Sequence, residues 1–166
     1  MSTTSVMSLS IPGLAMSAAT PGAAAGVPAA HRGGTDAGGQ APAQQTVLIA
    51  EDHEDSRDAL RTLLDAFGYR VILAGNGREA VETALATSPD LVLMDMMMPE
   101  VDGFEATRTL RASPAFRQVP IIALTAMEGA REHVMAAGCD DFMSKPLDVR
   151  TFLDRVRAWL ASGRPA

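Results

Sequence analysis

The fold is decided by the stretch Leu91-Val92-Leu93-Met94-Asp95-Met96-Met97-Met98-Pro99. An apolar run of strand length ends at one carboxylate, Asp95, and Pro99 then prevents further strand pairing. Burying an ionised carboxylate without partners costs free energy, so Asp95 needs compensating groups. Open α/β sheets place their functional sites at the carboxyl ends of strands. Asp95 is therefore predicted to be a site residue whose partners come from other strand ends.

Four further apolar runs predict strands, and helical patterns lie between them. The predicted strands cover residues 46–50, 69–74, 91–95, 119–125 and 141–144. The first helix is expected to be capped by Asp55 or Ser56, and two shorter helices are expected at about 104–111 and 130–137. Three helices are expected to bury an apolar face. The first face consists of Leu60, Leu63, Leu64 and Phe67, the second of Ala80, Val81, Ala84 and Leu85, and the third of Phe152, Leu153, Val156 and Leu160. Strands that alternate with helices indicate an α/β fold with a parallel sheet covered on both faces.

Composition divides the chain into a tail and one ordered domain. Residues 1–45 consist mainly of Ala, Gly, Ser, Thr and Pro, with no aromatic residue. Such a segment has little apolar surface to offset its ordering entropy, which predicts a disordered tail. Residues 46–162 are expected to form the domain, and residues 163–166 a short C-terminal tail.

Charge and cysteine content exclude several classes of function. A net charge of −6 argues against a nucleic-acid-binding surface, which would need clustered Lys and Arg. Cys139 is the only cysteine, so it forms no intrachain disulfide, and it is expected to act as a small buried hydrophobic residue. No apolar run approaches the ~20 residues that cross a bilayer. A cytoplasmic location is the simplest interpretation.

Five fragments, each at a predicted strand end, together resemble a response-regulator receiver domain. They are Glu51-Asp52, Asp95 with its Met-Pro sequence, Asp102-Gly103, Ala-Leu-Thr-Ala at 123–126, and Phe-Met-Ser-Lys-Pro at 142–146. The resemblance covers about residues 46–162. It implies a doubly wound, five-stranded parallel sheet of order 2-1-3-4-5 in a flavodoxin-like three-layer sandwich.

The resemblance also implies a phosphoryl-accepting site. Asp95 corresponds to the phosphoacceptor, which takes a phosphoryl group from the phosphohistidine of a sensor histidine kinase or histidine phosphotransfer protein. Three acids at one edge repel one another, and Mg²⁺ relieves that repulsion. The family pattern gives Asp52, Asp95 and the backbone carbonyl of Met97 as direct metal ligands, with Glu51 acting mainly through water.

Lys145, Thr125 and Phe142 match the residues that respond to phosphorylation in this family. Lys145 is the only lysine among 14 basic residues, and it matches the lysine that pairs with the phosphorylated aspartate. An arginine should not replace it well, because a planar guanidinium needs more room than an ammonium. Thr125 matches the switch hydroxyl, and Phe142 matches the aromatic residue that moves inward when that hydroxyl turns.

Met97 and Met127 occupy two positions that tune the phosphoryl lifetime in the family. Neither side chain orients an attacking water by a strong hydrogen bond, which predicts slow self-dephosphorylation. As a receiver the protein is also expected to catalyse its own phosphorylation, and it is not expected to be an enzyme in the usual sense. Ala126 is small and leaves a path for a partner's histidine. His133 is expected at the surface, and His53 is expected to be solvated beside the acidic pair.

Other functions were weighed against the receiver interpretation. A haloacid-dehalogenase-like phosphatase also uses a strand-end aspartate but needs a second one two residues later, where this chain has Met97. A flavodoxin-like cofactor binder would need a phosphate loop after the first strand, and Glu51-Asp52 would repel a phosphate there. A receiver that acts as a docking module without phosphorylation remains the alternative. We expect a stand-alone receiver, and the sequence leaves open whether it relays the phosphoryl group or binds a downstream target directly.

Overall fold

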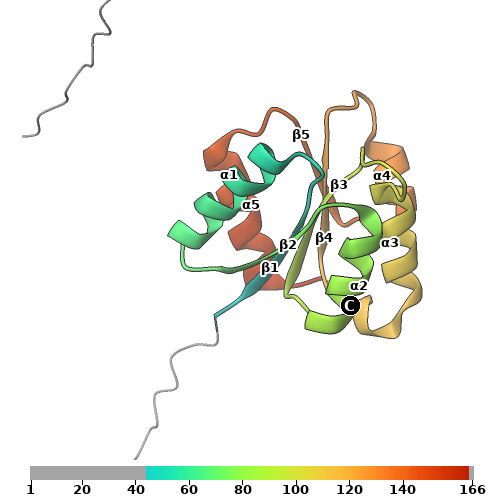
Figure 1. The fold of residues 1–166 in the computed structure, drawn as a ribbon, viewed down its shortest axis with the longest axis horizontal. Coiled ribbons are helices and arrows are strands. Elements are labelled where there is room, and N and C mark those ends of the chain that lie inside the picture. The colour runs from blue at the N-terminus through green and yellow to red at the C-terminus, as the bar shows by residue number, and fades with distance from the viewer. Residues whose placement is uncertain (1–43, 165–166) are drawn as a thin grey trace, which may run out of the picture. The chain divides into compact units, whose positions relative to one another are not determined.

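The computed structural model describes residues 44–164, and the tail predicted for residues 1–45 lies outside them except for Gln44 and Gln45. Within the described residues the elements run in the order β1 (Thr46–Ala50), α1 (Glu54–Ala66), β2 (Arg70–Ala74), α2 (Gly77–Thr87), β3 (Leu91–Asp95), α3 (Gly103–Ala112), a 3-10 helix (Pro114–Phe116), β4 (Ile121–Thr125), α4 (Arg131–Ala137), β5 (Asp141–Ser144) and α5 (Val149–Ser162). Helices α1 and α5 cover one face of the sheet, and α2, α3 and α4 cover the other (Figure 1). None of the helices in this part of the chain is long and apolar enough to cross a membrane.

The five strands form one parallel sheet in the order β2-β1-β3-β4-β5, as predicted. In this register Ala50 pairs with Met94, Asp95 with Leu124, and Thr125 with Ser144. All five strands point the same way, so their carboxyl ends meet at one edge of the sheet. The residues that follow β1, β3, β4 and β5 are thereby brought together.

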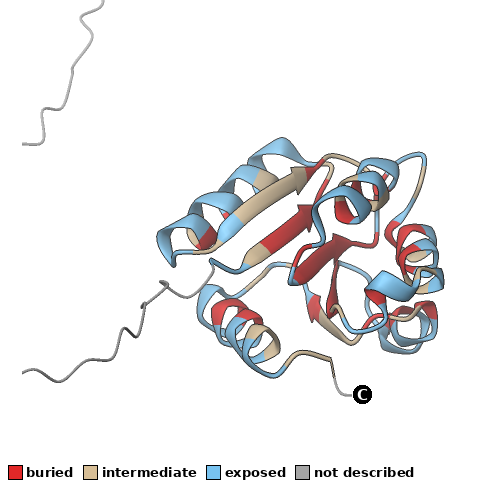
Figure 2. Ribbon diagram, turned by 90° about the horizontal axis from the view of Figure 1, so that it is seen from below, coloured by how far each residue is buried: buried red, intermediate tan, exposed pale blue. Residues whose placement is uncertain are grey.

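The core has two layers because side chains alternate between the faces of each strand. Leu91 and Leu93 pack with α1 and α5, whereas Val92 and Met94 pack with α2, α3 and α4. Every residue of β3 is buried, which is the pattern of a strand covered on both faces. The centre of the sheet is buried and the outer faces of the helices are exposed (Figure 2).

Three helices begin at the expected type of cap. The side chains of Asn76, Asp102 and Asp148 each accept a hydrogen bond from the backbone three residues later, which satisfies a free N–H of the first turn. The predicted cap of α1 at Asp55 or Ser56 is wrong. That helix begins at Glu54 without a side-chain cap, and the two acids in its first turn interact with the positive end of the helix dipole instead.

Two residues predicted to be buried are exposed. Leu85 follows Ala84 on α2 and lies on a different face of the helix from the buried residues Ala80 and Ala84. Phe67 lies just beyond the last residue of α1, where the chain has left helical geometry. The guanidinium of Arg157 on α5 covers its ring at 4.9 Å from the centroid, a cation–π contact. Leu160 is only partly buried.

Two strands begin later than predicted because of their backbone hydrogen bonds. Strand β4 starts at Ile121 because Pro120 has no N–H to donate, although its carbonyl still accepts from Val92. Strand β2 starts at Arg70 because the N–H of Tyr69 donates to Leu64 at the end of α1. The 3-10 helix has no counterpart among the predicted elements.

Arg111, at the end of α3, links the segments around β4 at the end of the sheet remote from Asp95. Its guanidinium donates to the carbonyls of Gly138, Phe116 and Val119 and forms an ion pair with Asp140. Burial lowers the pKa of Arg111, although the Asp140 carboxylate acts in the opposite direction. The same carboxyl group also pairs with Arg164 beyond α5.

Gly103 sets how closely α3 approaches the end of β3. A Cβ at this position would lie 2.2 Å from the carbonyl oxygen of Asp95 and 2.8 Å from the Cα of Met96. We expect Gly103→Ala to lower the free energy of unfolding by about 1–3 kcal/mol, the usual cost of overpacking. Urea denaturation measures this.

Gly75→Ala is the matched control, since its Cβ would meet only the ends of the Arg57 and Glu79 side chains at 3.3 Å and no backbone atom. Equal stability of the Gly103→Ala protein and the native protein would contradict the close approach of α3 to β3.

Candidate functional site

The site is built around the Lys145 ammonium, which lies between two carboxylates at the edge of the sheet. Its Nζ atom donates to Asp95 Oδ2 at 2.7 Å and to Glu51 Oε2 at 2.6 Å. Glu51 directly follows β1, Asp95 ends β3, and Lys145 directly follows β5. Both carboxylates are buried, whereas the lysine side chain is partly exposed. The sequence predicted the Asp95–Lys145 pair, and the structure adds Glu51 as a second direct partner.

The remaining carboxylate oxygens accept hydrogen bonds from the backbone. Asp95 Oδ1 accepts from the N–H of Met97 at 2.9 Å, and Glu51 Oε1 accepts from the N–H of His53 at 3.2 Å. A buried carboxylate is tolerated only when its charge is paired and its lone pairs are satisfied. Both acids meet this requirement, and Asp95 is held in a fixed orientation.

Opposing effects act on the protonation of Lys145. Desolvation of the ammonium lowers its pKa, but hydrogen bonds and Coulombic attraction from Asp95 and Glu51 outweigh this. The pKa of Lys145 therefore lies above its ordinary value. The lysine stays charged over the physiological range, which keeps a fixed positive charge beside Asp95.

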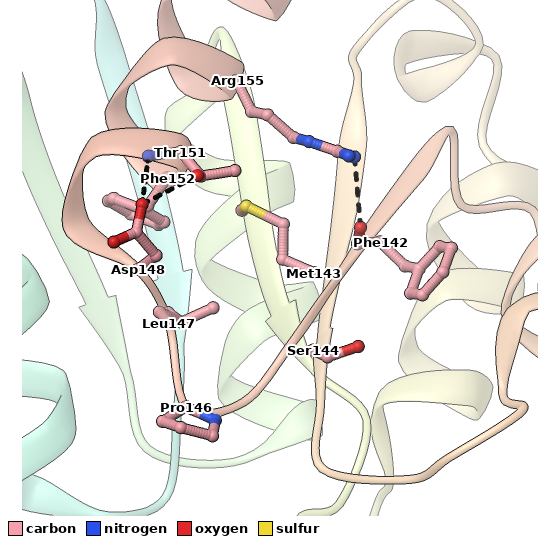
Figure 3. A pocket seen from close by; sticks show the side chains of 9 residues that line it. All are labelled: Phe142, Met143, Ser144, Pro146, Leu147, Asp148, Thr151, Phe152 and Arg155. Atoms are coloured by element: carbon pink, nitrogen blue, oxygen red, sulfur yellow. Dashed lines mark hydrogen bonds between the residues drawn. The ribbon is translucent and has the colours of Figure 1, made fainter.

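Thr125 connects the end of β4 to the same site. It is buried, its carbonyl accepts from the backbone N–H of Lys145 at 2.8 Å, and its Oγ1 accepts from the N–H of Met127 at 3.1 Å. Phe142, on β5, is partly buried and packs on the side of α2, α3 and α4. Figure 3 shows its ring on the side of β5 opposite to Met143, as alternation along a strand requires.

The pocket drawn in Figure 3 lies next to this site and is separate from it. It is lined by residues 142–144, by residues of the segment that leads into α5, including Asp148, and by residues of α5 itself, including Thr151. Arg155 crosses it and donates to the carbonyl of Phe142 at 3.3 Å. Neither Asp95 nor Lys145 lines this pocket.

Glu51, Asp52 and His53 form a cluster of possible metal ligands. One ligand atom from each lies within 4.8 Å of the other two. Carboxylate oxygens suit a hard divalent cation such as Mg²⁺. Asp95 does not belong to this cluster. It is connected to Glu51 through the Lys145 ammonium, which donates to both carboxylates. Glu51 and Asp52 thus offer neighbouring carboxylates after β1, and their role in binding a metal stays a prediction.

A family comparison agrees with this geometry. The sequence profile of the response regulator receiver domain matches residues 47–157. The chain belongs to the response regulator receiver family. The polar-differentiation response regulator DivK of Brucella anthropi is 39% identical over 118 residues, which are 70% of this chain and 96% of that protein. Membership decides against the phosphatase and the cofactor binder considered above.

Solved receiver structures resemble the described fold. The receiver domain of a sensor histidine kinase from Pseudomonas aeruginosa PAO1, which has a magnesium ion coordinated in its active-site cleft, is 38% identical. It matches with a TM-score of 0.68 over 72% of this chain and all of that chain (100%). The chemotaxis protein CheY4 of Vibrio cholerae is 28% identical, with a TM-score of 0.66 over 70% of this chain and 98% of that chain.

The remaining residues for which the sequence predicted a role lie at the edge of the Asp95 site or outside it. Met97 and Met127 are exposed. His133 lies on α4 and is exposed, as expected. Arg57 was not predicted as a site residue; it donates from α1 to the carbonyl of Glu51 at 3.0 Å. An arginine one turn into the helix that follows the acidic pair was the available signal.

Cys139 is buried beside Thr107, with 3.7 Å between Sγ and Oγ1, as a structural residue would be. Burial raises the pKa of this thiol from 9.0 to about 11. The folded state therefore keeps the proton after the unfolded state has lost it. Stability from this group is complete below pH 9 and declines as the pH rises to about 11.

We expect the free energy of unfolding to fall by roughly 1–3 kcal/mol over this alkaline range because of Cys139 alone. Urea denaturation at closely spaced pH values measures the slope, and Cys139→Ala serves as the comparison. The variant should lack this part of the decline. An identical slope in both proteins would show that the thiol is not protected by the fold.

Proposed function

We propose that Asp95 accepts a phosphoryl group from the phosphohistidine of a sensor histidine kinase or a histidine phosphotransfer protein. The observation that carries this proposal is the geometry of Asp95, a buried carboxylate at a strand end with Lys145 Nζ at 2.7 Å. A fixed cation beside a nucleophilic carboxylate is suited to the charge that a phosphoryl group brings. The family to which the chain belongs supports the same chemistry.

In the proposed transfer an Asp95 oxygen attacks phosphorus as the phosphorus–nitrogen bond of the donor breaks. The electron pair of that bond returns to the imidazole, and the phosphoryl group becomes an acyl phosphate on Asp95. The hydrogen bond from Met97 N–H holds the carboxylate in place, so little reorganisation precedes attack. Lys145 then balances the negative charge on the new group.

Mg²⁺ is the proposed cofactor, and it would neutralise charge on the phosphoryl oxygens. Asp52, Asp95 and the backbone carbonyl of Met97 are proposed as direct ligands, with Glu51 acting through water. The closeness of the Glu51 and Asp52 side chains supports this set, because oxygen donors are what Mg²⁺ prefers. The magnesium ion in the related Pseudomonas receiver domain gives further support.

Thr125 and Phe142 are proposed to convert phosphorylation into a change of surface. The Thr125 hydroxyl accepts from Met127 N–H in this structure and still has a proton to donate. We propose that it turns to donate to a phosphoryl oxygen, and that Phe142 moves inward into the space released. The backbone bond between Lys145 and Thr125 couples the ends of β4 and β5 during this change.

The chain itself is proposed to catalyse both its phosphorylation and a slow dephosphorylation. The side chains of Met97 and Met127 lack a group that would orient water strongly for attack, which favours a long-lived acyl phosphate. The phosphorylated surface would then bind a downstream target or pass the phosphoryl group to another histidine. We place this exchange in the cytoplasm, in keeping with the single buried thiol.

Incubation with acetyl phosphate tests the proposal directly. We expect the intact mass to rise by one phosphoryl group in the presence of Mg²⁺ and to remain unchanged after chelation with EDTA. The adduct should survive acid and be lost in base, as an acyl phosphate does. Asp95→Asn is the matched control because it keeps the shape of the side chain and removes the nucleophile.

An adduct of equal yield in Asp95→Asn would place the chemistry on another residue. No adduct from acetyl phosphate or from a phosphohistidine donor would contradict the proposal and leave the docking module as the function.

A further inference from the structure

Two methionines at the rim of the Asp95 site, Met97 and Met127, are exposed, and the two methionines adjacent to Met97 are buried. Met97 is 59% exposed, but Met96 and Met98 on either side of it are 0% and 7% exposed. Met127, after β4, is 40% exposed. An oxidant in solution therefore reaches the thioether of Met97 and is kept from the adjacent ones.

Both exposed methionines are tied by their backbones to the reacting groups of the site. The N–H of Met97 donates to the Asp95 carboxylate at 2.9 Å, and the N–H of Met127 donates to the Thr125 hydroxyl at 3.1 Å. Strands β3 and β4 are neighbours in the sheet. The two thioethers therefore belong to residues at the same end of adjacent strands, each in direct contact with a site residue.

We propose that Met97 and Met127 form an oxidation-sensitive pair that shortens the lifetime of the phosphoryl group on Asp95. This inference rests on the proposed function. The oxidant is a peroxide, in the simplest case hydrogen peroxide. The sulfur lone pair attacks one peroxide oxygen, the O–O bond breaks, and the sulfur is oxidised to a sulfoxide while the peroxide is reduced to water. Sulfoxide reduction by a thiol-dependent reductase makes the change reversible.

The sulfoxide changes the rim of the site from water-shedding to water-binding. A thioether is a weak hydrogen-bond acceptor, whereas a sulfoxide oxygen accepts hydrogen bonds strongly and makes the side chain polar. The backbone N–H of Met97 bonds the Asp95 carboxylate, so a water held by the sulfoxide of this residue is the proposed nucleophile. Its attack on phosphorus breaks the bond to the Asp95 oxygen, releases inorganic phosphate and restores the carboxylate. We expect oxidation to speed this loss about three- to tenfold, the effect of one net hydrogen bond on a rate.

The experiment uses the full chain, oxidised by limited hydrogen peroxide before phosphorylation. Peptide mass mapping locates the sulfoxides, including those on Met1, Met7 and Met16 outside the described residues. The protein is then loaded with acetyl phosphate and Mg²⁺, the donor is removed, and intact mass follows phosphoryl loss. The ratio of the rates after and before oxidation is compared in the native chain, in the double variant Met97→Leu with Met127→Leu, and in Met135→Leu.

Met135 is the matched control, since it is 44% exposed and lies within α4 rather than directly after β3 or at the end of β4, where Met97 and Met127 lie. We expect sulfoxides at Met97 and Met127 ahead of Met96 and Met98, and a raised rate ratio in the native chain and in Met135→Leu. The double variant should give a ratio near one. Circular dichroism before and after oxidation checks that the fold is intact.

Three results would overturn the inference. One is slow oxidation of Met97 and Met127 compared with the buried methionines. Another is an unchanged rate of phosphoryl loss after both have been oxidised, and the third is an equal response in the double variant. Failure of the proposed function gives a different result, because the unoxidised protein would then take up no phosphoryl group. Failure of the oxidation inference alone leaves phosphorylation of the unoxidised protein intact.

Discussion

The rest of the structure depends on one interaction, the contact of the Lys145 ammonium with the buried carboxylates of Glu51 and Asp95. Two buried acids at the ends of β1 and β3 would repel each other and would be poorly solvated. Lys145 removes both difficulties at once, with donor–acceptor distances of 2.6 and 2.7 Å. The lysine is in turn held by its backbone bond to Thr125. A single residue, through its ammonium and its backbone N–H, therefore links the ends of four strands.

The same interaction makes Asp95 responsive to a change of charge. In the proposed function, a phosphoryl group on this residue adds negative charge next to the lysine, whose backbone N–H bonds the carbonyl of Thr125. The ion pair, the hydroxyl and the β4–β5 backbone bond lie in one connected set of contacts. Such a connected set is what a local charge event needs if it is to alter a distant surface. The receiver family membership and the geometry thus support the same function.

Much of this could be predicted from the sequence because the signals were local. Apolar runs with sharp ends gave the strands, and parallel strand ends meet at one edge, which brought Asp95 and Lys145 together. Contacts that depend on how elements pack were not predicted. The direct Glu51–Lys145 bond joins residues far apart in the chain, and the hydrogen bonds of Arg111 converge from several segments. Phe67 and Leu85 were assigned to buried faces because periodicity takes no account of where a helix ends or how wide its covered face is.

The position of Lys145 between two carboxylates can be measured directly, because it is the only lysine in the chain. Protein labelled with [¹³Cε]lysine gives one lysine signal, and its chemical shift is followed by NMR as the pH is raised. The interaction predicts a pKa above the ordinary 10.5 and a lower pKa in Asp95→Asn, where one carboxylate is missing. A pKa at or below the ordinary value, unchanged in Asp95→Asn, would contradict the account.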